Sequence, residues 1–522
     1  LPLRSADNIV GLQAGVVDNH VRGSRTGDNA YYVDGVLMKD HWNGRNVTGS
    51  LSQVSMEEIS LEAGGFGAEY GGANGGIVNI ISKTGGSKFS GGVEVVSDFG
   101  ATEADTDPDK LYSYGYQLFN FQIGGPMTDK FRWYLSVEDE THADKNPSYG
   151  SHPYGEVTAY QTLSTTDSAF IWSQVPTADE NGVLNVANNV FYYEEVVRNN
   201  PDTTTTHVVG TNYSRKWGPK RNNDSHRTRI SGNVGADFGS FRMKLGYSGY
   251  NYLGDIYSSP GVTTSQRSND DPHNYQLLNW ENMRQNRSGM NMAYANGTFT
   301  LSSKSYVRAT ASLKSYTTTS YNDISTDKYE IDDKPWVEYG RRTTDWGSAN
   351  YYHRDDGKQA LPAQGLVYFA SYGRVPGSYS SRSEDQTGFR LDYVTNISNH
   401  EIKTGFENYS TIVRYYGISQ GYEIYEQIAK VDANGDGEVT KDEIGDYNSD
   451  GSAGTDKDLL DWKFSSYRNA YTTNIGYDIF GKETDAYDES THAQAPGNPV
   501  SNRLYLQDQI EYDDIVIKAG LS

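Results

Sequence analysis

The amino-acid sequence predicts a mainly β protein in which a compact N-terminal α/β domain is enclosed by a large antiparallel β-barrel. Two observations support this fold class. The segment Arg22–Gly86 is rich in glycine and carries short apolar runs, and the sequence after it alternates apolar and polar residues with a period of two. The connections between the alternating segments are short and long in turn. This order is the one expected of a plug that sits inside a membrane barrel.

The composition limits the classes of protein and partner. The chain has 522 residues, a formal net charge of −23 and no cysteine, and its mean hydropathy is −0.72. No apolar run reaches the ~18 residues of a transmembrane helix, but barrel strands escape that test because only alternate residues face lipid. The acidity excludes nucleic acid as a partner, since no basic patch is available for phosphate. Without cysteine there is no disulfide framework and no thiolate metal site.

The alternating segments are predicted to be strands with one apolar and one polar face. Their apolar residues, at every second position, lie within 119–123, 131–137, 241–247, 389–393 and 515–521. Charged residues between them, such as Arg132 and Glu138, do not suit the core of a sandwich. They suit the wet lumen of a barrel whose aromatic residues face lipid. We expect about eleven strands between Phe89 and Ser522.

The lengths of the connections indicate which end of the predicted barrel faces the periplasm and which faces outside. Tight turns are predicted at Gly125–Asp129, Phe238–Gly239, Gly297–Leu301 and Ser398–His400. Long polar connections are predicted at His142–Ser225, Gly254–Glu281, Ser320–Arg382 and Gly417–Ser501. In outer-membrane barrels the short turns face the periplasm and the long loops face outside. Such barrels normally have an even number of strands and no open edge in lipid, so we expect further strands beyond these residues.

Glycines in the N-terminal segment permit close packing inside a wall. They occur at Gly64-Gly65, Gly67, Gly71-Gly72 and Gly75-Gly76, where positive φ and close backbone approach are tolerated. Charged residues of the same segment are candidates for ion pairs with the wall, and each could equally be an ordinary solvated charge. These candidates are Arg22, Arg25, Glu58, Glu69 and Lys83.

A set of short motifs in this segment resembles the plug of TonB-dependent outer-membrane receptors. The motifs, in order, are Arg22-Gly23, Tyr32-Val33-Asp34-Gly35-Val36, Glu57-Glu58-Ile59, Glu69-Tyr70-Gly71 and Gly75-Gly76-Ile77-Val78-Asn79-Ile80. Their order and spacing are similar to receptors of the Bacteroidota and allied phyla. The resemblance implies a plug domain at residues 1–87 and a transmembrane barrel, incomplete in this chain, at residues 88–522.

The resemblance also implies a function and partners. Receptors of this family sit in the outer membrane, in contact with its lipid, and import a ligand such as a glycan, a peptide or a metal chelate. An inner-membrane TonB-type complex supplies energy by pulling on a short N-terminal TonB box, which we expect upstream of Leu1. Some of these receptors work with a surface lipoprotein lid.

A second motif, at Asp432–Glu443, follows the register of an EF-hand calcium loop. Gly437 occupies the sixth position, where the loop turns sharply, and Tyr422–Val431 is predicted to be the entering helix. The predicted oxygen ligands are Asp432, Asn434, Asp436, Glu438 (through its carbonyl), Thr440 and Glu443. The sequence therefore predicts one Ca²⁺ site in an extracellular EF-hand-like calcium loop at residues 421–461. We expect the ion to have a structural role rather than to act as a switch.

A related pattern follows directly and could form a second calcium loop. Its candidate ligands are Asp446, Asn448, Asp450, Ser452 and Asp456. The twelfth position is Lys457, which cannot bind a cation, so Asp456 or Asp458 would have to replace it. Turns rich in Asp and Asn that bind no metal have a similar sequence, and both interpretations stay open.

No catalytic constellation is recognisable, and we expect a protein that is not an enzyme. The ten histidines include no His-Glu-x-x-His pair, and there is no Gly-x-Ser-x-Gly sequence. Two alternatives to a transporter remain. The chain could be a structural barrel in a surface assembly that transports nothing, or a soluble, calcium-dependent β protein that binds glycans.

Overall fold

The fold was analysed in a computed structural model of the chain. It describes residues 6–98, 115–145, 223–255, 284–322, 378–419 and 424–522, apart from short gaps at 18–19, 48, 50, 72, 425–426, 429, 434–438 and 513–514. Between 146 and 222, and at 358–361, it gives the backbone of strands only. No helix among these residues is long and apolar enough to cross a membrane.

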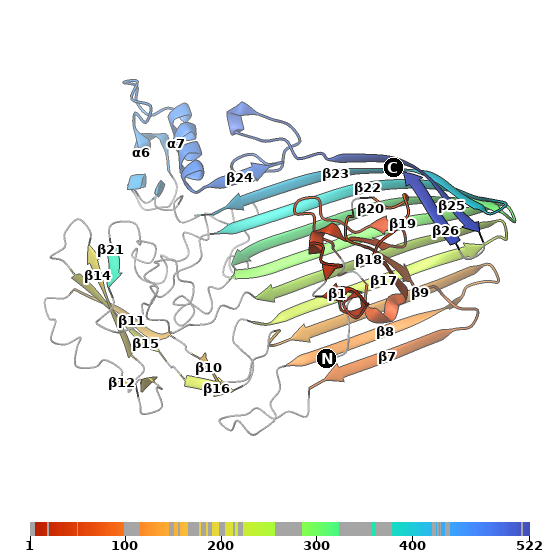
Figure 1. Ribbon diagram of the computed structural model, residues 1–522. Helices are drawn as coiled ribbons and strands as arrows, with labels where there is room; N and C mark the ends of the chain where they lie inside the picture. The colour runs from red at the N-terminus through yellow and green to blue at the C-terminus, as the bar shows by residue number, and fades with distance from the viewer. Residues whose placement is uncertain are drawn as a thin grey trace.

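The N-terminal domain is built on a four-stranded mixed sheet. Strand β3 (Ala30–Val33) lies parallel to β6 (Ile77–Ser82), and β4 (Val36–Leu37) and β5 (Met56–Glu62) flank them antiparallel. The smaller elements are α1 (Ala6–Val10), β1 (Val16–Val17), β2 (His20–Val21), η1 (Thr26–Asp28) and η2 (Gln53–Ser55). Val33, Val78 and Ile80 belong to its buried apolar core. This sheet lies across one face of a much larger one (Figure 1).

Eleven antiparallel strands form the larger sheet in one continuous path, as the sequence predicts. They are β7 (Ser90–Ser97), β8 (Tyr116–Pro126), β9 (Phe131–His142), β17 (Ser225–Asp237), β18 (Phe241–Asp255), β19 (Arg284–Ser302), β20 (Ser305–Asn322), β22 (Tyr379–Ile397), β23 (His400–Ile418), β25 (Val500–Tyr512) and β26 (Ile515–Leu521). A short strand, β24 (Thr472–Ile475), pairs with β23 beside this path. We call the eleven strands the wall and the N-terminal domain the plug.

The two ends of the wall differ in their connections. Tight turns join the strands at 127–130, 238–240, 303–304 and 398–399, all at one end (Figure 1). Connections at the other end span 98–115, 143–224, 256–283, 323–378 and 419–499. Short and long connections therefore alternate as predicted, and we call the ends periplasmic and extracellular.

One predicted turn was wrong. Gly297–Leu301 was expected to end a strand, but β19 continues to Ser302 and turns at 303–304. Gly297 instead pairs with Met243 on one side and Ala309 on the other. A Cβ atom at Gly297 would lie 3.4 Å from the ring of Phe241, an ordinary van der Waals contact. Gly297 is therefore a regular residue of the strand.

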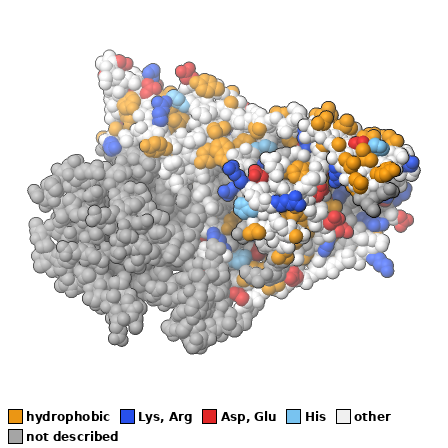
Figure 2. Space-filling model, in the orientation of Figure 1, with side chains coloured by type: hydrophobic (Ala, Val, Ile, Leu, Met, Phe, Trp, Pro, Cys, Tyr) orange, Lys and Arg blue, Asp and Glu red, His pale blue; other side chains and the backbone are white. Residues whose placement is uncertain are grey.

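The wall exposes apolar side chains outward and buries polar ones inward. On β17, Ile230 and Val234 are exposed while Arg229, Ser231 and Asn233 are buried. The same inversion runs along β9, β22 and β25. Hydrophobic side chains gather over the end of the wall that carries β25 and β26 (Figure 2). A soluble fold has the opposite polarity, and this arrangement is that of a barrel wall in lipid.

Aromatic rings cluster at the periplasmic end of β9, β17 and β18. Phe131 meets Phe238 edge-on with ring centroids 5.7 Å apart, and Phe238 stacks on Phe241 at 6.4 Å. The Lys130 ammonium lies 5.7 Å from the Phe238 centroid. Such a group of rings and a cation is typical of the girdle at a membrane–water interface.

The long connections contain structure of their own. Backbone strands within two of them are β10 (Ser151–Tyr154), β11 (Val157–Ser164), β12 (Thr177–Ala178), β13 (Leu184–Asn185), β14 (Val190–Val197), β15 (Thr204–Thr211), β16 (Ser214–Trp217) and β21 (Lys358–Leu361). Between β23 and β25 lie α6 (Lys441–Ile444), α7 (Asp456–Asn469), β24 and η7 (Glu489–Thr491). We call residues 441–499 the extracellular module.

Candidate functional site: the plug–wall interface

Asp34 fastens the middle of the plug to the wall. It occupies the turn between β3 and β4 with a φ of 49°, and Gly35 follows at 84°. Two left-handed residues in a row make the tight hairpin that an Asp-Gly pair favours. The turn places the Asp34 carboxylate, whose side chain is only 4% exposed, against β18 and β19.

Four groups surround this carboxylate and its carbonyl. Lys244 Nζ lies 2.9 Å from Asp34 Oδ1, and the Tyr294 hydroxyl donates to Oδ2 at 2.6 Å. Ser82 of the plug donates to the same Oδ2 at 2.6 Å, and Asn296 Nδ2 donates to the Asp34 carbonyl at 2.9 Å. A buried charge is tolerated only when it is paired and hydrogen-bonded in this way. The Asp34 site is therefore an anchor whose parts depend on one another.

A second anchor holds the plug loop Asp40–Asn46, which we call the apical loop. Arg382 Nη2 lies 2.7 Å from Asp40 Oδ2. The backbone N–H groups of His41 and Trp42 donate to Glu384 at 2.9 and 3.3 Å. Arg382 and Glu384 lie near the extracellular end of β22, so the apical loop is on the extracellular side of the plug.

The buried Lys314 ammonium supports the chain entering this loop. It donates to the carbonyl oxygens of Leu37 at 3.1 Å and Lys39 at 2.9 Å. Asp40 in turn accepts from the N–H of Trp42 at 2.8 Å. The apical loop is thus held by Lys314 of the wall and by the hydrogen bond between Asp40 and Trp42 inside the loop.

The third anchor joins the plug segment Ala68–Glu69 to β23 and β25. Arg503 Nη2 donates to the Glu69 carbonyl at 2.8 Å and to Glu407 at 2.8 Å. The Ala68 N–H donates to Gln507 Oε1 at 2.7 Å, and Lys403 Nζ lies 3.5 Å from Glu69 Oε1. This plug segment is therefore tied to the wall by both its backbone and a side chain.

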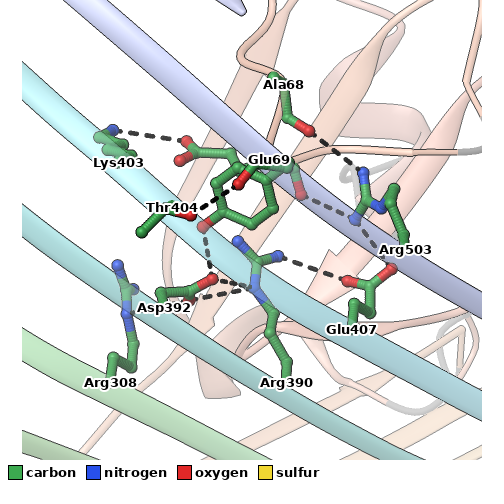
Figure 3. Close-up of polar contacts among 10 residues, drawn as sticks. Ala68, Glu69, Arg308, Arg390, Asp392, Lys403, Thr404, Glu407 and Arg503 are labelled. Atoms are coloured by element: carbon green, nitrogen blue, oxygen red, sulfur yellow. Dashed lines mark hydrogen bonds and ion pairs between the residues drawn. The ribbon is translucent and has the colours of Figure 1, made fainter. Parts of the chain in front are cut away.

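The network continues into the wall behind this segment. Arg390 Nε donates to both carboxylate oxygens of Asp392, at 2.9 and 3.0 Å, and its Nη1 lies 3.7 Å from Glu407. The Tyr505 hydroxyl donates to Asp392 at 2.6 Å. Figure 3 shows Arg390 between the two carboxylates and Arg503 on the far side of Glu407. Each buried carboxylate thus has a cationic partner.

Further contacts fasten the opposite side of the plug. Arg229 of β17 donates to the Gly49 carbonyl at 3.1 Å while pairing with Glu138 and Glu140 of β9. Asn233 Nδ2 donates to the Lys83 carbonyl at 2.7 Å. The plug is thus anchored by β17 as well as by β18, β22, β23 and β25.

The chain resembles known proteins over part of its length. No family model matches the chain. A curated relative, the TonB-dependent transporter Oar of Myxococcus xanthus, is 26% identical over 148 residues, which is 26% of this chain and 14% of that protein. The plug and the antiparallel wall have the arrangement that the resemblance to TonB-dependent outer-membrane receptors predicts. The relative is described as a transporter.

Solved structures resemble the chain at low sequence identity. The outer membrane transporter YddB of Escherichia coli is 10% identical, with a TM-score of 0.44 over 96% of this chain and 49% of its own. The FrpB iron transporter of Neisseria meningitidis is 9% identical, with a TM-score of 0.43 over 95% of this chain and 51% of its own. The chain therefore spans about half the length of these structures.

The residues predicted to join the plug to the wall have different positions in the receptor. Glu69 pairs with Lys403, while Lys83 meets the wall through its carbonyl oxygen. Among the described residues, Arg22, Arg25 and Glu58 form no ion pair with the wall. Arg22 and Arg25 lie in local turns of the plug, and Glu58 is on the exposed side of β5.

The sequence analysis missed the anchors Asp34 and Asp40. Asp34 belongs to the quoted motif Tyr32–Val36, and its Asp-Gly pair was the signal that could have found it. Its partners Lys244 and Tyr294 are 210 and 260 residues away. Such partners can be identified only when the strand register is known.

The first predicted calcium loop is described in part. Asn434, Asp436 and Glu438 lie outside the described residues. At the other end, Glu443 accepts hydrogen bonds from the N–H groups of Ala433 at 3.2 Å and Thr440 at 2.8 Å. The carboxylate at position 12 is thereby folded over the loop, and Thr440 caps α6. Of the predicted entering helix, residues 424, 427–428 and 430–431 are helical and the rest lies outside the described residues.

The second predicted loop is closed by its own hydrogen bonds. Asp446 accepts from the N–H groups of Asp450 at 2.9 Å and Gly451 at 2.7 Å. Asp450 accepts from Ser452. Such hydrogen bonds from backbone N–H groups to Asp side chains are those of Asp-rich turns. Within the described ranges, no three His, Asp or Glu side chains are grouped so as to hold a metal ion.

Asp458, rather than Asp456, faces this second loop. Asp456 pairs with Lys441 at 3.2 Å and is 91% exposed. Asp458 accepts from Asn448 Nδ2 at 2.7 Å and from the Thr455 N–H at 2.9 Å. Hydrogen bonds from Thr455, and then from Asn448, hold the pKa of Asp458 below its usual value. Asp458 therefore occupies the capping position that Glu443 has in the first loop.

Proposed function

We propose that the chain forms the plug and the first eleven strands of an active transporter that imports a ligand across the outer membrane. The observation that carries this proposal is the nature of the plug–wall interface. The plug is held by separate polar anchors at Asp34, Asp40 and Glu69, beside apolar contacts with Met290, Met292 and Tyr409 of the wall. Ion pairs and hydrogen bonds of this kind can exchange for water when the plug is pulled, so a plugged wall can open and close again.

The energy source and the ligand follow from the family resemblance. We propose a TonB-type inner-membrane complex as the energy-transducing partner, with its contact segment preceding Leu1. The ligand would be a glycan, a peptide or a metal chelate, delivered with or without a surface lipoprotein lid. Oar and YddB are transporters by description, and FrpB is an iron transporter.

Depletion of a defined ligand mixture from the medium would test transport. Cells expressing the receptor, with or without a working TonB complex, would be given oligosaccharides, peptides and ferric siderophores, and mass spectrometry would follow each component. We expect one component to disappear only when receptor and complex are both present. Equal depletion in all cells would contradict transport. Receptor-dependent but energy-independent depletion would contradict the TonB proposal.

A scaffold role is the alternative that the same cells can reveal. If no component is depleted while the purified receptor carries stable, stoichiometric partner chains, a structural barrel is favoured. The soluble glycan-binding alternative has less support, because the apolar outer face of the wall would be exposed to water.

We also propose that the first predicted calcium loop, Asp432–Glu443, which leads into the extracellular module, binds one structural Ca²⁺. Extracellular calcium modules bind with dissociation constants of about 0.1–1 mM, and a receptor loop outside the cell meets such concentrations. The Glu443 carboxylate supplies the bidentate ligand in this proposal, with Asp432 at the opposite end of the loop.

Titration of the purified receptor with calcium chloride would test this proposal. We expect Glu443→Gln to weaken binding by roughly tenfold or more, because the affinity depends on the number of charged ligands. Glu489→Gln, which removes an exposed carboxylate of the same module outside the loops, is the matched control and should leave binding unchanged. No measurable heat with the unmodified receptor in millimolar calcium would contradict the site.

A further inference from the structure

The extracellular module replaces a barrel strand beside the apical loop. Strand β23 pairs with β25 only from His400 to Ser410. Above that point the two N–H···O bonds between Val413 and Gly497 measure 2.7 and 2.9 Å. From Tyr415 to Ile418 the partner of β23 is β24 of the module. The extracellular end of β23 is therefore held by β22 on one edge and by the module on the other.

Two adjacent residues of β23 face opposite sides of this junction. Tyr415 stacks on Trp42 of the apical loop, with centroids 4.9 Å apart and planes 15° from parallel. Tyr416 points to the other face, because side chains alternate along a strand. There its hydroxyl donates to the Ile479 carbonyl at 3.0 Å and its ring lies 5.6 Å from that of Tyr477. One peptide unit thus separates a plug contact from a module contact.

The module forms a packed body around Tyr416. Phe464 and Tyr467 of α7 pack on Phe480, with centroids 5.4 and 5.1 Å apart. Tyr416 and Ile418 belong to the same buried cluster as these α7 residues. A shift of α7 would therefore move the end of β23 rather than be absorbed by a loose loop, since a close-packed cluster transmits displacement.

Trp42 is in a position to respond to such a shift. It is 43% exposed, and its main hold on the wall consists of the Tyr415 stack and the N–H bond to Glu384. Arg414, next to Tyr415, is tied to the module through Asp485. The Trp42–Tyr415 stack is therefore the contact through which a displacement of the module would reach the plug.

We propose that the extracellular module positions the apical loop of the plug through Tyr416 and Tyr415, so that binding to the module changes how firmly the loop is seated. The two states of this device are a loop stacked on Tyr415 and a loop released from it. The regulatory consequence rests on the proposed transport function, but the coupling itself is a property of the receptor alone.

Hydrogen exchange on the intact receptor in detergent micelles would test the coupling without ligand or energy source. In Tyr416→Ala, which removes a side chain that faces away from the plug, we expect the amides of residues 40–47 to exchange about 5–150 times faster, the usual range of a coupling free energy between two sites. Phe406→Ala, an outward-facing aromatic on the same strand but far from the module, should leave them unchanged. If residues 464–480 exchange faster while residues 40–47 do not, the proposal fails.

A second variant, Trp42→Ala, tests the same coupling from the plug side if Tyr416→Ala does not fold. Coupling is reciprocal, so Trp42→Ala should speed exchange at residues 472–480 of the module, which Trp42 does not touch, and Trp42→Phe should restore most of the protection. Unchanged exchange there would overturn the proposal. Both results are independent of uptake, so failure of the coupling and failure of transport remain distinguishable.

Discussion

Asp34→Ala is expected to loosen the whole plug in the wall. The substitution leaves the Lys244 ammonium, 16% exposed, without its counter-ion and removes the acceptor of the Tyr294 hydroxyl. Breaking a buried ion pair by removing one partner costs about 3–5 kcal/mol. We expect hydrogen exchange of residues 30–37 and 77–82 to accelerate by several orders of magnitude, and channel conductance in planar bilayers to rise.

An exposed ion pair of the same wall provides the control for this prediction. Asp237 and Arg242 lie 3.2 Å apart at a periplasmic turn, with side chains 58% and 71% exposed. Exposed pairs contribute about 0–1 kcal/mol, so Asp237→Ala should alter neither exchange in the plug nor conductance. Equal effects of the two alanine variants would show that Asp34 is not an anchor.

Arg390→Met is expected to destabilise the wall itself. Arg390 is the cation between Asp392 and Glu407 (Figure 3), and both carboxylates are buried. Methionine preserves much of the side-chain volume of Arg390. It removes the cation between Asp392 and Glu407, so these carboxylates keep only their other partners. We expect a loss of about 3–5 kcal/mol, measurable as a lower temperature at which the heat-modified band appears in gel electrophoresis.

The neighbouring Arg308 is a matched control. It reaches the same Asp392 at 3.7 Å but is 49% exposed, so Arg308→Met should have a small effect. Arg390→Lys should recover only part of the stability, because a lysine cannot span both oxygens of Asp392 while reaching Glu407. If Arg308→Met and Arg390→Met destabilise equally, the buried position of Arg390 is not the cause.

Much of the fold was predictable from the sequence because the patterns that encode it are local. Alternation of Phe131, Trp133 and Leu135 with polar residues defines a strand and its lipid face within a few positions. The plug strand Ile77–Ser82 was recognisable from its apolar run. The exception, the turn predicted at Gly297–Leu301, arose because glycine favours turns but also occurs inside strands. Pairing of Gly297 with Met243 and Ala309, on two other strands, continues β19 through this position.

The plug–wall anchors were predictable only in part, because they join distant segments. Glu69 could be suggested from charge and motif, yet its partner Lys403 is 334 residues away. Arg22, Arg25 and Glu58 are also charged, but among the described residues they form no ion pair with the wall. The difference is one of orientation within the plug, which local sequence patterns do not encode. The calcium loop, by contrast, was suggested by spacing alone and stays a prediction.

The aromatic group at the periplasmic end has a consequence for the immersion depth of the receptor. Aromatic rings form girdles at the membrane interfaces of such barrels, and the Lys130 ammonium beside Phe131, Phe238 and Phe241 favours water. They would therefore hold the turn end of the cylinder at one leaflet boundary, whatever the acyl chain length. In a thicker bilayer, the difference between the bilayer thickness and the apolar height of the wall would appear at the extracellular end. There the lipid would have to thin around the strand ends.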